Sequence, residues 1–199
     1  MVAAKVKVYL KECLGDQKDN SNLSQLDIDW GTSLNLQFHQ AVRSMGSHED
    51  WQIRGKNREE FQGWISKHKV HSLFFDGAAK GNPGNAGAGG DIKNADGISI
   101  HNFAWGLGIN SSIQAEALAL YQGLNLLLKL EIKEAIIFGD SEVIIKTMVT
   151  NSIPRDLRLA RLIQRIRSVV KLLQDLKYFH VLRGNNKEAD LEANKVAQL

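Results

Sequence analysis

The arrangement of hydrophobic and polar positions changes near residue 70. Before it, polar stretches alternate with short apolar segments that keep no period. After it, apolar runs and amphipathic segments follow one another in regular order, which is typical of a packed domain. We therefore predict a linker or truncated remnant, partly disordered, over residues 1–69 and a folded domain over residues 70–199. Trp51, Phe61 and Trp64 are the aromatic residues before this boundary that are candidates to pack against the domain.

Nine elements are expected in the second part. The run at 70–75 has no polar face, which predicts a central strand covered on both sides. Residues 81–84 and 94–97 predict turns, and the polar residues 110–112 offer N-caps for a helix. The predicted strands are 70–75, 86–93, 98–106, 135–138 and 177–182, and the predicted helices are 113–130, 142–150, 157–176 and 186–197.

The order of these elements predicts the fold class. Three strands in succession, followed by strands separated by helices, favour an antiparallel meander extended by parallel strands. We expect an α/β domain with a five-stranded mixed sheet, three strands antiparallel and two added in parallel, and with flanking helices.

Composition narrows the class of protein. Hydrophobic residues make up 43% of the chain and charged residues 24%, which is typical of a soluble globular protein. No segment approaches the roughly 20 apolar residues that span a membrane, so no membrane association is expected. The single cysteine, Cys13, excludes an internal disulfide and favours an intracellular location, nuclear or cytoplasmic. The net charge of +3 permits nucleic-acid binding without requiring it. We expect a monomer.

Four acidic residues occupy comparable places in these elements. Asp76 and Asp140 are expected to end the first and fourth strands, and Glu116 and Asp190 lie about one turn into helices. Ligand sites of open α/β sheets form at the carboxyl ends of strands, so the two aspartates meet if their strands are neighbours. Four clustered carboxylates cannot all stay ionised without cations, and their oxygens suit Mg²⁺ or Mn²⁺. Two such ions can activate a water and stabilise the leaving oxygen of a phosphodiester.

Each acid also has a purely structural interpretation. Asp140 precedes a predicted helix and can act as its N-cap, whereas Glu116 and Asp190 are first-turn charges that the helix dipole favours. Asp76 can simply close a turn. Their convergence on one edge of the predicted sheet favours the metal site over four separate structural roles.

Four segments follow one another in this order: FFDGAAKGNPGNAGAGG, SSIQAEALALYQGL, IIFGDSEVIIK and HVLRGNNKEADLEAN. They resemble the ribonuclease H type 1 family, in the form found in plants and in retroelements related to reverse transcriptase. The resemblance covers about residues 69–199. It implies cutting of the RNA strand of an RNA–DNA hybrid with two Mg²⁺ or Mn²⁺ ions. The acids Asp76, Glu116, Asp140 and Asp190 match the metal-binding positions of the family. The implied nucleic-acid contacts are Gly77, Asn82, Ser112, Gln114 and Arg183.

Departures from the family leave alternatives open. Ser112 and Ile113 stand where the family often has asparagines, and the short loop between Val181 and Asp190 contains no histidine. His180 falls in the last predicted strand. One alternative is a catalytically weak or inactive nucleic-acid-binding domain derived from a retroelement, and another is an interaction domain whose acids are helix caps. The basic stretch 155–171 binds phosphates or forms a solvated helix face.

Overall fold

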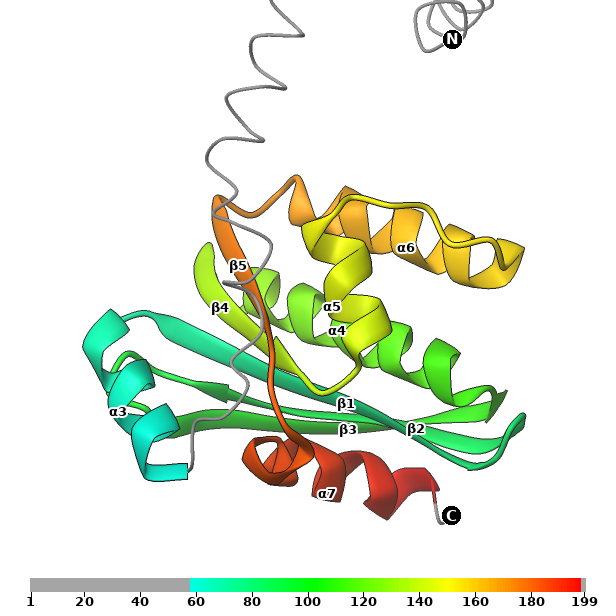
Figure 1. Ribbon diagram of the computed structural model, residues 1–199, viewed down its shortest axis with the longest axis horizontal. Coiled ribbons are helices and arrows are strands. Elements are labelled where there is room, and N and C mark those ends of the chain that lie inside the picture. The colour runs from blue at the N-terminus through cyan, green and yellow to red at the C-terminus, as the bar shows by residue number, and fades with distance from the viewer. Residues whose placement is uncertain (1–57, 198–199) are drawn as a thin grey trace, which may run out of the picture. The chain divides into compact units, whose positions relative to one another are not determined.

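A computed structural model describes residues 58–197, which form five strands and six helices, one of them a short 3₁₀ helix (Figure 1). No helix in this part of the chain has the length and apolar character needed to cross a bilayer. The strands are β1 (His71–Gly81), β2 (Gly84–Lys93), β3 (Ser99–Asn110), β4 (Glu134–Gly139) and β5 (Asp175–His180). The helices are α3 (Arg58–His68), α4 (Ser112–Lys129), α5 (Glu142–Val149), α6 (Leu157–Val170), η1 (Arg183–Asn185) and α7 (Lys187–Ala197).

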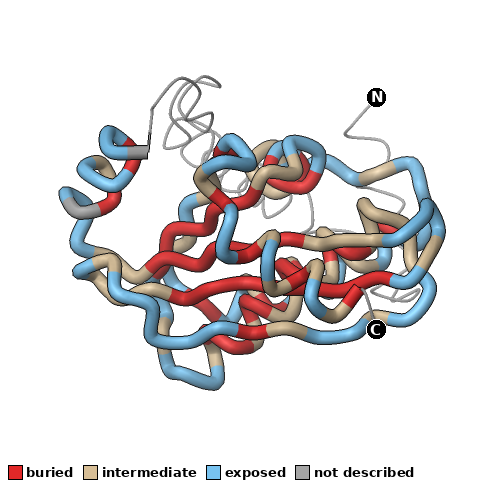
Figure 2. The backbone as a smooth tube through the Cα atoms, turned by 90° about the horizontal axis from the view of Figure 1, so that it is seen from below, coloured by how far each residue is buried: buried red, intermediate tan, exposed pale blue. Residues whose placement is uncertain are grey.

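The strands form one mixed sheet in the order β3-β2-β1-β4-β5. Strands β1, β2 and β3 pair antiparallel, whereas β4 is parallel to β1 and β5 is parallel to β4. The predicted fold class is therefore confirmed. Helices α4, α5 and α6 cover one face of the sheet and α7 covers the other (Figure 1). Figure 2 shows that the buried positions concentrate in the middle strands and on the inner sides of the helices.

The two largest errors in the predicted boundaries have the same cause. Asp76 does not end the first strand, because residues 76–81 continue as a hairpin paired with residues 84–89 of β2. The helix predicted over residues 157–176 ends at Val170, since β5 begins at Asp175, where it pairs with Glu134 of β4. In each case a partner strand distant in the sequence decides where the element begins or ends.

Glycines in β2 bring α7 unusually close to the sheet. A Cβ atom added to Gly87 would lie 2.3 Å from the carbonyl oxygen of Ala193, and one added to Gly89 would lie 2.1 Å from the Ala193 nitrogen. The buried residues of α7 are themselves alanines. Small residues on both sides thus let the helix backbone approach the strand, which places Asp190 of α7 beside the central strands.

Helix α3 packs against the sheet through aromatic side chains. Phe61 is 1% exposed, and its ring makes edge contacts with Phe74 and Phe138 at centroid distances of 6.2 and 5.2 Å. Trp64 makes a similar contact with Phe179 at 5.0 Å. Two of the aromatic candidates therefore pack as expected, while Trp51 lies outside the described residues. The domain boundary after residue 69 stays a prediction, and α3 is a packed element that precedes it.

Candidate functional site

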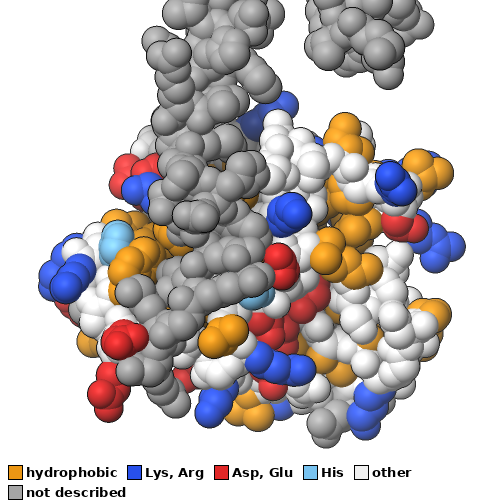
Figure 3. Space-filling view, in the orientation of Figure 1, with side chains coloured by type: hydrophobic (Ala, Val, Ile, Leu, Met, Phe, Trp, Pro, Cys, Tyr) orange, Lys and Arg blue, Asp and Glu red, His pale blue; other side chains and the backbone are white. Residues whose placement is uncertain are grey.

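Three of the predicted acids converge at one point of the fold. Asp76, Glu116 and Asp140 each offer a carboxylate oxygen, and these oxygens lie within 4.8 Å of one another. Strands β1 and β4 are parallel neighbours whose pairing ends at Phe74 and Phe138, so the residues just beyond this point lie side by side. Figure 3 shows one face of the molecule, on which acidic side chains gather near the centre, with basic side chains and a histidine beside them.

Glu116 reaches the cluster because α4 begins very close to β1. A Cβ atom added to Gly77 would lie only 2.1 Å from the backbone nitrogen of Glu116, so this position requires glycine. The helix start is held by a capping box, in which the Ser111 hydroxyl accepts a hydrogen bond from the Gln114 nitrogen and the Gln114 side chain accepts one from the Ser111 nitrogen. The cap thus fixes where the first turn of α4, and with it Glu116, meets the sheet.

Burial and mutual repulsion make this cluster costly to ionise. Asp76 is 4% exposed, and burial raises its pKa to about 7, with the charges of Asp140 and Asp190 adding to the shift. Burial, together with the charges of Asp76 and Asp140, also raises the pKa of Glu116 well above its usual value. The buried Oε2 of Glu116 has no hydrogen-bond partner in the described part of the chain. A divalent cation would neutralise these charges and supply the missing partner, so the residues fit a metal site.

The fourth predicted acid lies beside this group of three. Asp190 accepts a 2.5 Å hydrogen bond from Nη2 of Arg183, whose side chain is 73% exposed. Its charge is near enough to raise the pKa of Asp76, while the Arg183 guanidinium lowers it. The structure thus brings three acids together and holds the fourth against an arginine next to them.

The remaining predicted contacts lie around the start of α4. The Oδ1 atom of Asn82, in the turn between β1 and β2, accepts a hydrogen bond of 3.1 Å from the Ser112 nitrogen. Ser112 is the first residue of α4, Gln114 belongs to its capping box, and Gly77 lies beneath it. These four residues are neighbours in space, and their contact with nucleic acid stays a prediction.

Two residues near the acids were given no role by the sequence. Asn186 is completely buried, and its Nδ2 donates hydrogen bonds to the Phe75 carbonyl oxygen and to Oδ1 of Asp140. Asn186 lies in the segment HVLRGNNKEADLEAN and begins the helix predicted over residues 186–197, and neither feature indicated a partner for its side chain. His180 is the last residue of β5, as its strand assignment predicted, and its Nε2 lies 3.1 Å from the Asp140 carbonyl oxygen.

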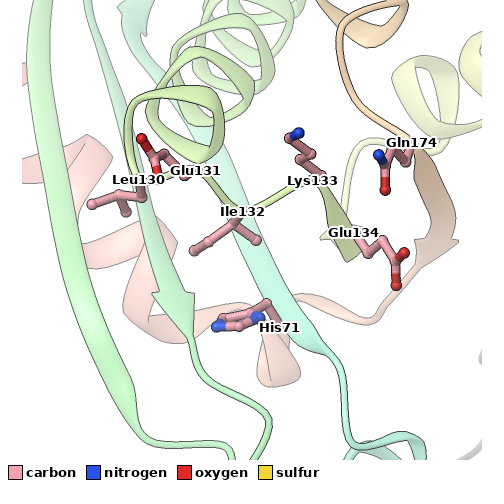
Figure 4. A pocket seen from close by; sticks show the side chains of 7 residues that line it. All are labelled: His71, Leu130, Glu131, Ile132, Lys133, Glu134 and Gln174. Carbon is pink, nitrogen blue, oxygen red and sulfur yellow. The ribbon is translucent and has the colours of Figure 1, made fainter.

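A separate cavity lies at the opposite end of the parallel strands (Figure 4). It has a volume of about 460 Å³ and is lined by residues at the amino ends of β1, β4 and β5, including His71, Glu134 and Gln174. Ligand sites in open α/β sheets form at the carboxyl ends of strands, where the acids are. The acids are therefore the stronger candidate for a functional site.

Comparison with known proteins assigns both the fold and the family. The structure of RNase H1 from the halophilic archaeon Halobacterium salinarum matches 65% of this chain and 98% of its own, with a TM-score of 0.63 and 29% identity. The structure of LC11-RNase H1 in complex with an RNA/DNA hybrid matches 64% of this chain and 96% of its own, with a TM-score of 0.61 and 26% identity. The domain thus has the ribonuclease H fold.

Residues 74–196 match the model of the family described as reverse transcriptase-like, and the chain belongs to this family. A putative ribonuclease H protein of Arabidopsis thaliana is 32% identical over 143 residues, which cover 68% of this chain and 22% of the plant protein. Ribonuclease HI of Halobacterium salinarum is 31% identical over 127 residues, covering 64% of this chain and 63% of the archaeal one. The chain therefore spans less than two thirds of either relative.

Without metal, the protein is expected to lose stability as the pH rises from about 4 to 7. Unfolded Asp76 releases its proton near pH 3.8, whereas the folded protein keeps it up to about pH 7. Between these values the folded state binds more protons, so the free energy of unfolding falls with pH, by a total on the order of 3–4 kcal/mol. Urea unfolding in EDTA at several pH values measures this slope.

Asp76→Asn should make this slope shallower, because asparagine does not titrate and Glu116 is then the acid of the cluster that keeps a raised pKa. Asp175→Asn serves as the matched control, since Asp175 is exposed at the start of β5. The control should leave the pH dependence unchanged. A wild-type protein whose stability stays constant or rises between pH 4 and 7 in EDTA would contradict the burial of an uncompensated Asp76.

Proposed function

We propose that this chain is a metal-dependent endonuclease that hydrolyses the RNA strand of RNA–DNA hybrids. The observation that carries the proposal is the convergence of Asp76, Glu116 and Asp140 within 4.8 Å at the carboxyl end of the parallel strands. Solved structures of ribonucleases H share this fold, and one of them is a complex with an RNA/DNA hybrid. The alternative of an inactive binding domain is not favoured, because the buried carboxylates lower the stability of a protein that binds no cation to neutralise them.

Asp76, Glu116 and Asp140 would hold a divalent cation, and Asp190 is the candidate further ligand in a two-ion arrangement. Carboxylate oxygens are the ligands that Mg²⁺ and Mn²⁺ prefer. When bound, such ions activate a water and stabilise the leaving oxygen of a phosphodiester. The protein contributes a rigid and partly desolvated arrangement of acids, because Asp76 is fixed within β1 and Glu116 within the first turns of α4.

The polar residues around the start of α4 are the candidate contacts with the RNA strand. RNA differs from DNA by a 2′-hydroxyl, which short polar side chains and exposed backbone can bind. Gly77, Asn82, Ser112 and Gln114 supply such groups on one side of the acids. Arg183, exposed beside Asp190, is the candidate phosphate contact on the other side. This arrangement would place the scissile bond of the RNA strand over the carboxylates.

A cleavage assay on a hybrid with a labelled RNA strand tests the proposal. We expect cutting with Mg²⁺ or Mn²⁺, no cutting in EDTA, and no cutting of duplex DNA of the same sequence. Retention of the hybrid on native gels without any cutting in either metal would overturn the enzymatic proposal and leave the binding domain.

Helix α6 presents a basic face that is suited to phosphate binding. Arg158, Arg161 and Arg165 are exposed and spaced by three and four residues, so they share one side of the helix. The guanidinium of Arg165 lies 4.7 Å from the ring centroid of Tyr121, which holds the side chain in place. Arg167 instead donates a hydrogen bond of 2.7 Å to the Ser152 carbonyl oxygen, which indicates a structural role.

Replacing both Arg161 and Arg165 with alanine should reduce the salt dependence of hybrid binding. Each lost phosphate contact removes about one unit from the slope of log K against log salt concentration, so a decrease of about two units is expected. Binding titrations at several salt concentrations measure it. A double alanine variant of the exposed lysines Lys129 and Lys177 changes the net charge equally and should keep the slope. Equal slopes for both double variants would assign the α6 arginines to a solvated face.

A further inference from the structure

Asn186 links two of the strands that carry the acids. Its Nδ2 donates one hydrogen bond of 2.9 Å to the Phe75 carbonyl oxygen and another of 3.1 Å to Oδ1 of Asp140. Phe75 directly precedes Asp76 in β1, and Asp140 directly follows β4. A single buried amide group therefore joins the backbone beside one acid to the carboxylate of the other.

The position of Asn186 is that of a helix cap, but its side chain does not cap. The main-chain carbonyl oxygen of Asn186 accepts a 3.0 Å hydrogen bond from the Asp190 nitrogen, as expected for the residue before the first turn of α7. An asparagine there usually accepts a further hydrogen bond through its side-chain oxygen. The Oδ1 atom of Asn186 has no hydrogen-bond partner among residues 58–197, although the residue is fully buried. An unpaired buried oxygen costs free energy, so helix capping does not explain the residue.

The two acceptors explain why an amide occupies this position. Phe75 and Asp140 both present oxygens that require a donor, and the two N–H groups of one planar amide bind both at a set angle. An aspartate would face these oxygens with a further acceptor and a like charge. An alanine would leave both without a donor in the interior and free the Asp140 carboxylate to turn away from Asp76.

We propose that Asn186 is a positioning residue, whose amide holds the Asp140 carboxylate in the orientation that binds a divalent cation. The inference rests on the proposed function, because it assigns Asn186 a part in the same metal site. Mutation of a residue that hydrogen-bonds to a metal ligand and orients it typically lowers metal affinity or activity 10–100-fold.

Calorimetric titration with Mg²⁺ tests the inference on wild type, Asn186→Ala and Asn186→Asp. We expect Asn186→Ala to bind Mg²⁺ about 10–100-fold more weakly. On the hybrid, kcat should fall by a similar factor while KM stays within about threefold, since no substrate contact is removed. Asn186→Asp should lose at least as much activity, because it replaces both donors with an acceptor.

Asn125→Ala is the matched control. The Asn125 amide is partly buried in α4 and donates a 2.7 Å hydrogen bond to the Tyr121 carbonyl oxygen, so its removal also takes a side-chain amide donor away from a backbone carbonyl oxygen. This variant should lose stability but keep its Mg²⁺ affinity and kcat. The thermal midpoint of every variant is measured alongside, so that folding losses are separated from effects on the site.

The outcomes separate this inference from the proposed activity. An Asn186→Ala protein with a lowered thermal midpoint but wild-type Mg²⁺ affinity and kcat would overturn the inference and make the residue structural. If Asn186→Ala does not fold, Asn186→Ser keeps one donor and should show weakened Mg²⁺ binding; wild-type affinity in that variant would equally overturn it. A wild-type protein that binds Mg²⁺ without cutting the hybrid would overturn the proposed activity alone, and the Mg²⁺ affinities would then decide the role of Asn186.

Discussion

Asp76→Asn and Asp140→Asn are each expected to lower the rate of hybrid cleavage at least 1,000-fold, or roughly 4 kcal/mol of transition-state stabilisation. Each change keeps the shape of the side chain but removes a negative charge from the cluster that would hold the cation. Single-turnover cleavage with saturating Mg²⁺ measures the chemical step without interference from product release. The same variants should bind Mg²⁺ more weakly.

Stability measurements distinguish this loss from unfolding. In EDTA at neutral pH, Asp76→Asn should be more stable than wild type, because it removes a carboxylate whose pKa burial raises to about 7. An inactive variant that is more stable than its parent has lost a functional group. Asp175→Asn, an exposed acid on β5, should retain full activity. Cleavage by either cluster variant at the wild-type rate would rule out this site.

Phe61→Ala is expected to lower the free energy of unfolding by about 3–4 kcal/mol, as for other large aromatic residues removed from a core. Phe61 is 1% exposed and packs against Phe74 of β1 and Phe138 of β4. Phe138 lies two residues before Asp140, so the cavity would also loosen the strand end that carries this acid. Urea unfolding measures the loss of stability. The rate of hybrid cleavage per folded molecule shows whether the change also disturbs the acidic cluster.

Phe61→Leu is the matched variant, because it keeps most of the apolar volume and should cost less than about 1.5 kcal/mol. Glu59→Ala, exposed in the first turn of α3, should change the stability little. Helix α3 lies outside residues 74–196, which match the family model. A loss below 1 kcal/mol for Phe61→Ala would therefore mean that the domain is stable without α3.

Much of the fold could be predicted from local patterns. The run of apolar and β-prone residues at 70–75, which has no polar face, indicated a central strand, and β1 lies between β2 and β4. The polar residues at 110–112 indicated a helix start, and Ser111 is the N-cap of α4. These features depend on residues close together in the sequence, where side-chain period and capping preference act directly. The same reasoning placed Asp76 and Asp140 near each other once their strands were assumed to be neighbours.

Element ends and side-chain partners depended on the tertiary structure. Strand β1 extends five residues beyond Asp76 because β2 pairs with these residues in a hairpin. The helix predicted at 157–176 ends early because residues 175–180 pair with β4 as a strand. The sequence placed Asp190 with the other acids, whereas the structure pairs it with Arg183. Asn186 was predicted as the first residue of the last helix, yet its side-chain amide donates a hydrogen bond to the Phe75 carbonyl oxygen, 111 residues away. The hydrophobic periodicity that predicts a helix or strand depends on residues close together in the sequence. The hydrogen-bond partner of a buried polar group can instead lie far away in the sequence, so only the tertiary structure determines which partner it has.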